Sequence, residues 1–468
     1  MIDLRRPGQR SFGEGLIEEE TANLWEPWMR HADQVLEDEQ LVKTVYEALL
    51  KRRPKSRTRG RRGVAAEIVL RMMLLKHIRN WSFEDLEREV RPNLLYREFT
   101  RIGSGKVPDA KTLGRQAQAL GPEVVEQIHR RMVELAVKNK VVQGRKMRVD
   151  TTVVETNIHY PTDSSLLGDG DRVLTRLMKK VTAMVGAAGT KLRNRMRSVG
   201  RRVAEIARAS RAKGEKGKQK IEPLYRKLLG ITGRVVGQAK RFSSEIASGV
   251  KRSSDVLKQA ALEGLKREID GMLETVKKVV AQTKARIFSG DTHVGGKILS
   301  VFETSTEVIR KGKASKPTEF GKMVKIQEAE NQIVIDYEVY DQKPSDSDLL
   351  IPSIEAHQTL MGRTPDLAAA DAGFYSAKNV AEAEEMGVKR VSVPNRSTKR
   401  PARRQYQKQR WFKKGQKWRT GCEGRISLLK RRHGLRRSLY KKDAGMKRWV
   451  GLGVIADNLI NIGRVLAN

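Results

Sequence analysis

A change of hydrophobic period at residue 146 limits the folds that this chain can adopt. Before that position, apolar residues recur at spacings of three and four, as over residues 38–52, 65–78 and 123–137. From Met147 to Val153, every second residue is apolar or β-branched. The first spacing is typical of amphipathic helices and the second of a strand. The sequence therefore predicts a helical N-terminal part followed by a part that contains a β-sheet.

The charge of the chain indicates its class of partner. Its 468 residues carry 94 Lys and Arg against 55 Asp and Glu, a formal net charge of +39. Self-repulsion of this size destabilises a compact fold, so we expect an anionic partner, most simply a nucleic-acid backbone. The single cysteine, Cys422, excludes an internal disulfide framework and indicates a reducing cytoplasm. No apolar run reaches the length of a membrane span, so no membrane partner is expected.

The helical N-terminal part divides into two segments. Residues 1–63 are helical and basic in pattern, and residues 51–62 within them form either a solvated linker or a DNA-backbone contact. Residues 64–140 contain three or four short helices, one opened by a capping box from Ser82 to Asp85. Short helices joined by turns predict a helix-turn-helix-like DNA-binding domain.

Strands alternate with helices in two later stretches, residues 141–165 and 320–468. Beyond the strand that carries Asp150, the pattern predicts a hairpin, a helix, a strand, a helix and a strand, at residues 324–340, 348–360, 367–370, 377–386 and 388–393. This alternation predicts a mixed α/β core. The apolar stripe from Trp449 to Leu466 is predicted to be a helix of that core.

A long basic block, residues 166–319, interrupts the predicted core. Residues 171–290 contain one proline, Pro223, and apolar residues recur at helical spacing from Leu262 to Val280. Long helices are expected, arranged as a helical hairpin broken near residues 213–220. A coiled-coil arm, a dimerisation element, a DNA clamp and a plain spacer all fit this pattern.

Three acids stand in settings that suit metal-dependent chemistry. Asp150 lies on the predicted strand, and Asp371 ends another, where ligands bind in open α/β sheets. Glu423 and Asp443 are the two acids of residues 396–448, which contain 21 Lys and Arg. An acid within a phosphate-binding segment is explained if it holds a cation. Mg²⁺ prefers oxygen ligands. Two such ions about 3.5–4 Å apart can bind both the attacking and the leaving oxygen of a phosphoryl displacement. Each acid alone also fits a cap or a turn.

These motifs resemble, in order, those of bacterial insertion-sequence transposases of the DDE type. The run Asp150-Thr-Thr-Val-Val-Glu-Thr-Asn-Ile-His159 is similar to their first-aspartate motif, and Ala370-Asp-Ala-Gly-Phe-Tyr375 to their second. Residues 419–430 resemble the Arg-x3-Glu-x6-Lys signature, although Gln416 stands where the fuller signature has Tyr. Residues 316–321 and 451–459 are also similar, and residues 40–120 resemble the InsH-like N-terminal domain of that group.

The resemblance implies a ribonuclease-H-like mixed-sheet core with a helical N-terminal domain and a long helical insertion. It implies Asp150, Asp371 and Glu423 as catalytic ligands of two Mg²⁺ ions, for which Mn²⁺ can substitute. The predicted DNA contacts are the bases of the same signature and its surroundings: Arg419, Arg425, Lys430, Arg431 and Arg432.

The function that the resemblance implies is DNA transposition by a polynucleotidyl transferase with endonuclease activity. The expected partners are double-stranded DNA, as terminal inverted repeats and as target, and further copies of the chain on that DNA. The alternatives are an inactive DNA-binding protein derived from a transposase, a metal-dependent nuclease that does not join its products, and an RNA-packaging protein. Glu155 and His159 are either partners of the acids or structural, and Cys422 is expected to be a buried thiol.

Overall fold

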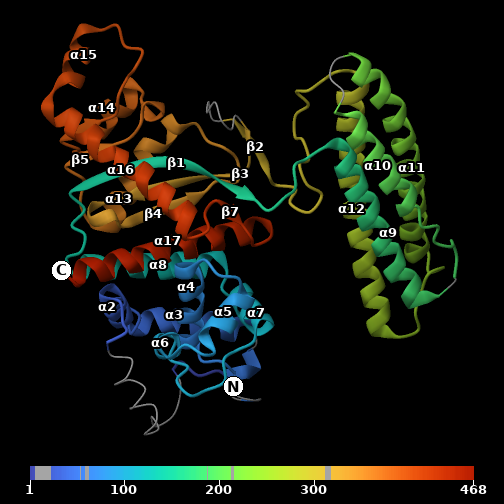
Figure 1. The fold of residues 1–468 in the computed structure, drawn as a ribbon, viewed down its shortest axis with the longest axis horizontal. Coiled ribbons are helices and arrows are strands. Elements are labelled where there is room, and N and C mark those ends of the chain that lie inside the picture. The colour runs from blue at the N-terminus through green and yellow to red at the C-terminus, as the bar shows by residue number, and fades with distance from the viewer. Residues whose placement is uncertain are drawn as a thin grey trace. The chain divides into compact units, whose positions relative to one another are not determined.

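The computed structural model describes residues 1–5, 23–52, 54–57, 59, 63–186, 188–211, 215–310 and 318–468. Outside these ranges lie parts of the predicted basic link, of the residue 316–321 motif and of the predicted break near residues 213–220. The chain forms two compact units. One unit comprises Met1–Asn157 and Glu307–Asn468, and the other, the helical unit, comprises Ile158–Thr306 (Figure 1).

The first unit begins with short helices, as the sequence predicts. They are α2 (Pro27–Val35), α3 (Glu39–Arg52), η1 (Pro54–Arg57), α4 (Ala66–Arg79), α5 (Phe83–Val90), α6 (Leu94–Phe99), α7 (Ala110–Ala119) and α8 (Pro122–Lys138). The predicted capping box is confirmed at α5, where the Asp85 amide donates to the Ser82 hydroxyl at 3.0 Å and the Ser82 amide donates back to the Asp85 carboxylate at 3.2 Å. Helix α4 is buried along nearly its whole length, so the other helices pack around it.

The C-terminal helix α17 (Lys442–Leu466) belongs to the same core as these N-terminal helices. It packs against α2, α4 and α8 and runs beside them in Figure 1. Gly463 lets it approach α2, because a Cβ there would collide with the backbone of Trp28. Among the described residues α17 alone is long and apolar enough to span a membrane, but 78% of its most apolar window is buried within the protein. The predicted core helix is therefore confirmed.

A mixed sheet forms the centre of the first unit, which confirms the predicted α/β class. Its strands are β1 (Lys146–Thr156), β2 (Glu307–Arg310), β3 (Thr318–Glu328), β4 (Val334–Val339), β5 (Leu367–Ala369), β6 (Arg390–Ser392) and β7 (Arg437–Ser438). The order is β2-β3-β1-β5-β6, with β4 paired to β3 and β7 to β1. Strand β1 is antiparallel to β3 and parallel to β5, and the predicted hairpin is β3–β4 around the short helix η2 (Glu330–Gln332).

Helices cover both faces of this sheet. They are η3 (Asp346–Leu349), α13 (Leu350–Met361), η4 (Ala372–Phe374), α14 (Ala377–Glu385), α15 (Pro401–Lys408) and α16 (Arg410–Arg432). Met147 and Val149 of β1 pack with α13 and α14, whereas Val154 packs with α16 and α17. Because successive strand residues point to opposite faces, the even-numbered residues of β1 face α16.

The described residues of the helical unit form four helices with an apolar core of their own. They are α9 (Asp163–Val185), α10 (Met196–Ala209), α11 (Glu215–Ala247) and α12 (Val256–Phe288). The prediction of a single helical hairpin is wrong, because the chain also turns at residues 186–195 and 248–255. Gly186 and Gly249 take positive φ angles of 68° and 75° at these turns, a conformation that favours glycine.

Candidate active site

The sheet places Asp150 and Asp371 in register with each other. The last parallel pair between β1 and β5 joins Arg148 to Ala369, and both aspartates follow two residues later. Neighbouring strands lie about 4.8 Å apart, and residues two apart point to the same face. Both carboxylates therefore start from adjacent positions beside the carboxyl end of β5, on the face that α16 covers.

Backbone amides fix each of these two carboxylates. Asp150 Oδ1 accepts a hydrogen bond from the amide of Thr151 at 2.7 Å, and Asp371 Oδ1 accepts one from the amide of Gly373 at 2.7 Å. Asp371 thereby caps the short helix η4 that follows β5. One oxygen of each carboxylate is thus oriented by the local chain.

Helix α16 carries Glu423 across the same face of the sheet (Figure 1). Two glycines allow the close approach. A Cβ at Gly415 would lie 2.7 Å from the Cβ of Ser392, and one at Gly421 would collide with the guanidinium of Arg148. The sequence places small residues where the helix crosses the strands, so Glu423 is brought to the cavity that the two aspartates line.

The three acids line one cavity of about 1440 Å³. Its acidic lining residues are Asp150, Glu155, Glu319, Asp346, Asp371 and Glu423, and its basic ones are Arg310, Lys343, Lys430, Arg431, Arg436 and Arg437. A cavity lined by both carboxylates and basic side chains suits a ligand that contains both a divalent cation and phosphate groups.

Arg419 holds two of the three acids through its guanidinium. Its Nη2 lies 2.8 Å from Glu423 Oε1, and its Nη1 lies 3.6 Å from Asp150 Oδ2. The side chain of Arg419 is 10% exposed, whereas that of Glu423 is 61% exposed. Among the described residues, no three His, Cys, Asp or Glu side chains are placed to hold one ion. The guanidinium therefore supplies the positive charge between Asp150 and Glu423 in this arrangement.

Gln416 stands where the family signature has Tyr, and it binds the strand ends beside the acids. Its Nε2 donates to the carbonyl oxygens of Ala370, at 3.2 Å, and Ser392, at 2.5 Å. Ala370 immediately precedes Asp371 in the chain. Gln416 therefore connects α16, which carries Glu423, to the strand that carries Asp371.

Two family models match this chain. One, described as "Transposase domain (DUF772)", matches residues 26–118, and the other, described as "Transposase DDE domain", matches residues 297–459. Together they cover more than half of the sequence, and the second includes Asp371 and Glu423. The chain belongs to the DDE transposases of insertion sequences. No curated protein and no solved structure matches it.

The structure corrects one predicted DNA contact of this transposase, Arg425. Its side chain is 3% exposed and pairs with Asp457 at 2.8 Å and with Glu328 at 3.3 Å. Arg148 completes the group, at 2.8 Å from the second oxygen of Glu328. Position 425 lies about 200° around the helix from Glu423, so it faces the core and not the cavity. Arg425 therefore stabilises the packing of α16 on the sheet.

Of the other predicted bases, Arg419 is buried beside the acids, whereas Lys430, Arg431 and Arg432 are reached by solvent. Lys430 is half-buried and Arg431 is exposed, and both line the cavity. Arg432 is exposed but is not among the cavity residues, because it lies half a turn from the face of Glu423. Sequence reasoning missed Arg436 and Arg437, which follow α16 and line the same cavity.

A further acid that sequence reasoning missed, Asp346, lies beside the two aspartates. Its Oδ1 accepts a hydrogen bond from the hydroxyl of Thr151 at 3.0 Å. A Cβ at Gly373 would lie 3.1 Å from Asp371 Oδ1 and 3.2 Å from Asp346 Oδ2, so the two carboxylates flank this glycine. The available signal was the acidic run of η3 directly before a predicted helix.

Three other residues that drew attention in the sequence have separate surroundings. Cys422 is buried, and burial raises the pKa of its thiol well above the usual range, so it is the inert thiol that we expected. Glu155 lines the cavity and pairs with Arg437 at 3.0 Å. His159 belongs to the helical unit, where its Nε2 lies 3.6 Å from Asp169.

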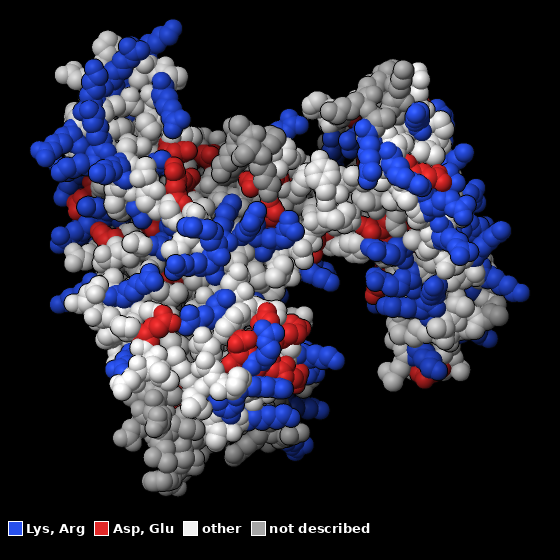
Figure 2. Space-filling view, viewed as in Figure 1, with Lys and Arg blue, Asp and Glu red and all other residues white. Residues whose placement is uncertain are grey.

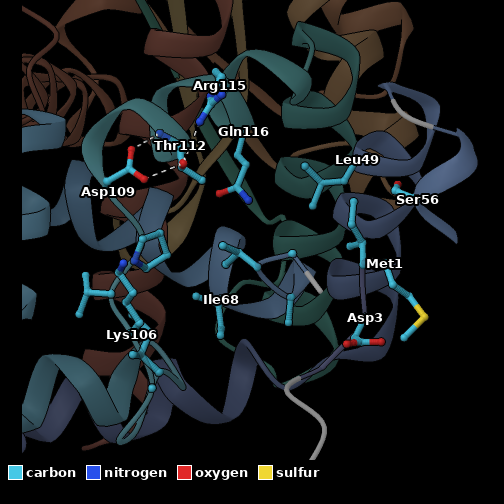
Figure 3. A pocket seen from close by; sticks show the side chains of 18 of the residues that line it. Met1, Asp3, Leu49, Ser56, Ile68, Lys106, Asp109, Thr112, Arg115 and Gln116 are labelled. Carbon is cyan, nitrogen blue, oxygen red and sulfur yellow. Dashed lines mark hydrogen bonds between the residues drawn. The ribbon is translucent and has the colours of Figure 1, made fainter. Parts of the chain in front are cut away.

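A second cavity of the transposase, of about 720 Å³, lies among the N-terminal helices (Figure 3). Asp109 caps α7 at its wall by accepting hydrogen bonds from the amide and the hydroxyl of Thr112, both at 2.9 Å. Lys106 and Arg115 also line it, and among its described lining residues the acids are Asp3 and Asp109. The carboxylate set of the first cavity is therefore not repeated here.

Proposed function

We propose that this transposase cuts DNA at the ends of its insertion sequence and joins the freed 3′ ends to target DNA. Asp150, Asp371 and Glu423 are the proposed catalytic ligands of two Mg²⁺ ions, for which Mn²⁺ can substitute. The observation that carries the proposal is the register of Asp150 with Asp371 beneath the helix that carries Glu423, all three on one cavity. A ribonuclease-H-like core is the fold that we propose for this arrangement.

The residues present suit the metal chemically. All three proposed ligands are carboxylates, which are hard oxygen donors of the kind that Mg²⁺ prefers. When bound, two such ions would activate the attacking oxygen and stabilise the leaving oxygen of a phosphoryl displacement. Three carboxylates in one cavity repel one another, and Arg419 offsets part of this repulsion in the present arrangement.

Arg419 has two roles in the proposed mechanism. Its guanidinium lies between Asp150 and Glu423 and offsets part of their negative charge. For the carboxylates to bind cations, these pairs must be given up, and the guanidinium then becomes free to donate to a phosphate oxygen. Lys430 and Arg431, on the same cavity, position the neighbouring phosphates. Binding and orientation of the scissile strand are thus the work of the chain's own bases.

The remaining parts of the transposase have proposed roles in recognition. We propose that residues 64–140 bind the terminal inverted repeats and that residues 1–63 extend this helical part. We propose residues 141–165 and 320–468 as the catalytic core and residues 166–319 as an insertion into it; by packing, the inserted helical unit is Ile158–Thr306, and strand β2 belongs to the sheet of the core. Copies of the chain assemble on DNA to bring two element ends together, in the cytoplasm.

The experiment compares wild type with Asp371→Asn on a plasmid that carries the element with its own flanking DNA. With Mg²⁺ or Mn²⁺, wild type should nick at the element ends and form joined products, and Asp371→Asn should do neither while still binding the DNA. Joined products formed at the wild-type rate by Asp371→Asn would contradict the assignment. Nicking without joining would favour a nuclease, and footprinting without any cleavage would favour an inactive DNA-binding protein.

A further inference from the structure

A loop in the helical unit lies across one face of α11. The buried side chain of Gln238 donates from Nε2 to the carbonyl oxygen of Lys191 at 2.7 Å. Further along α11, Glu245 accepts from the amide of Thr190 at 3.0 Å, and Lys251, which follows the helix, donates to the carbonyl oxygen of Thr190 at 3.2 Å. Residues 188–195 are therefore fixed to the helix and do not form an independent surface loop.

This loop brings four arginines together, which we call the arginine cluster: Arg193, Arg195, Arg234 and Arg241. Arg195 Nη1 donates to Gln238 Oε1 at 3.4 Å and to the carbonyl oxygen of Arg193 at 3.1 Å. Positions 234, 238 and 241 are four and three residues apart, so they share one face of α11. The loop arginines thus lie over the helix face that carries Arg234 and Arg241.

The arginine cluster has no acidic counterpart. Burial and the neighbouring charges of Arg193, Arg234 and Arg241 lower the pKa of Arg195. In the part of the unit that the structure describes, none of the four arginines forms an ion pair. Arg193, Arg234 and Arg241 are exposed, and Arg195 is half-buried. Like charges held close without counter-charges are destabilising unless an anion binds them.

The surroundings of the arginine cluster are strongly basic as well. Residues 172–241 contain 21 Lys and Arg against three acids, whereas α12 contains seven against four. Figure 2 shows Lys and Arg side chains over much of the visible face of the helical unit. The net charge is therefore +18 over residues 172–241 and +3 over α12, so the excess charge of the unit lies mostly between residues 172 and 241.

We propose that the arginine cluster is a second DNA-binding site of this transposase, which holds backbone phosphates of duplex DNA. A guanidinium donates two parallel hydrogen bonds to a phosphate, and four of them match a run of phosphates better than a single small anion. Phosphates would also relieve the repulsion within the cluster. Phosphate contacts carry no sequence information, so binding through the cluster is independent of sequence. The inference rests on the proposed function only for the choice of DNA over RNA.

The test is a salt titration of DNA affinity with the full chain. The probe is a fluorescein-labelled 40-bp duplex of arbitrary sequence, bound in EDTA and followed by anisotropy. Each phosphate contact contributes about 0.9 to the slope of log K against log salt. Arg234→Gln with Arg241→Gln should therefore lower the slope by about two and weaken binding roughly tenfold near 150 mM salt.

The control removes the same charge from a mixed-charge face. Lys277→Gln with Lys278→Gln changes two exposed lysines of α12, and its slope and affinity should stay near wild type. An unchanged slope in the arginine variant, or an equal loss in the lysine variant, would overturn the proposal. The proposal would also be overturned if the arginine variant lost affinity for an RNA duplex of the same sequence but kept its affinity for DNA. Because the assay contains no divalent metal, it measures DNA affinity alone, and a catalytically inactive chain would give the same affinity. A failure of the proposed catalytic function can therefore be distinguished from a failure of this proposal.

Discussion

Arg419 donates a hydrogen bond from Nη2 to Glu423 Oε1 at 2.8 Å, one helical turn further along α16. With Nη1 also 3.6 Å from Asp150, the guanidinium competes with a divalent cation for two of the three proposed ligands. One guanidinium therefore offsets part of the charge of these carboxylates, and its competition with a cation can be measured.

Replacing Arg419 should separate metal binding from catalysis. Arg419→Ala removes the competing charge, so the affinity for Mn²⁺ should rise, by about tenfold if roughly 1.4 kcal/mol of competition is lost. Cleavage should nevertheless fall, because the proposed phosphate contact is lost. Calorimetry with Mn²⁺ and a nicking assay measure the two effects. Lys414→Ala, an exposed base on the same helix, should change neither, and weaker Mn²⁺ binding by Arg419→Ala would contradict the competition.

Loss of the Gln416 side chain should loosen the strand end beside Asp371. Gln416→Ala removes the hydrogen bonds to the carbonyl oxygens of Ala370 and Ser392. We expect a loss of about 1–3 kcal/mol in the free energy of unfolding, with the upper value applying if the Ala370 carbonyl finds no new partner, since the Ser392 carbonyl keeps the amide of Ala370. Chemical denaturation measures the free energy of unfolding. The control is Lys417→Ala, which changes the exposed residue that follows Gln416 in the helix. Equal stability of the two variants would show that Gln416 does not connect helix and strand.

Arg425 should matter for stability and not for DNA affinity. Arg425→Ala leaves Asp457 as a buried charge without its arginine, while Glu328 keeps Arg148, and the uncompensated carboxylate costs about 3–5 kcal/mol. Arg432→Ala, exposed at the end of the same helix, should change the free energy of unfolding by less than about 0.5 kcal/mol. Urea unfolding compares the two. A folded, fully stable Arg425→Ala variant with weakened DNA binding would restore the original prediction for this residue.

Asp171 gives the helical unit a pH-dependent stability. It is fully buried, its carboxylate accepts a hydrogen bond from Thr232 at 2.9 Å, and burial raises its pKa from 3.8 to about 7. The folded state therefore retains a proton that the unfolded chain loses. Between about pH 4 and pH 7 the contribution of Asp171 to the free energy of unfolding falls as pH rises, and above pH 7 the whole penalty is present.

Asp171→Asn should remove this penalty. It should stabilise the chain at pH 8, by at most about 4 kcal/mol for a shift of this size, and should have little effect near pH 4. Thermal unfolding across pH measures the difference from wild type. Glu263→Gln, at an exposed position of α12, should follow wild type at every pH. A destabilising effect of Asp171→Asn at pH 8 would show that the carboxylate is charged and satisfied in the fold.

The strands and most helices could be predicted from the sequence because their patterns are local. The alternation around Asp150 and the apolar stripe from Trp449 to Leu466 depend only on neighbouring residues. The pairing of Asp150 with Asp371 could not be predicted in this way, because the whole helical unit separates the two strands in the sequence. Their neighbouring positions follow only from the order β3-β1-β5 in the sheet.

The errors at the site also have physical reasons. Arg425 was grouped with the other bases by composition, although its helical position already sets it opposite Glu423. Its partners Glu328 and Asp457 lie on a strand and a helix far away in the sequence, so their pairing is not a local signal. Asp346 resembled an ordinary helix-start residue, and only the folded sheet brings it beside Asp371.

The most direct test of the central claim is a crystal structure of the transposase with element-end DNA and Mn²⁺, whose ions are located by anomalous scattering. The account predicts two Mn²⁺ ions about 3.5–4 Å apart, bound by Asp150, Asp371 and Glu423, with Arg419 released to a phosphate. Mn²⁺ bound elsewhere, or a site without Asp371 as a ligand, would contradict it.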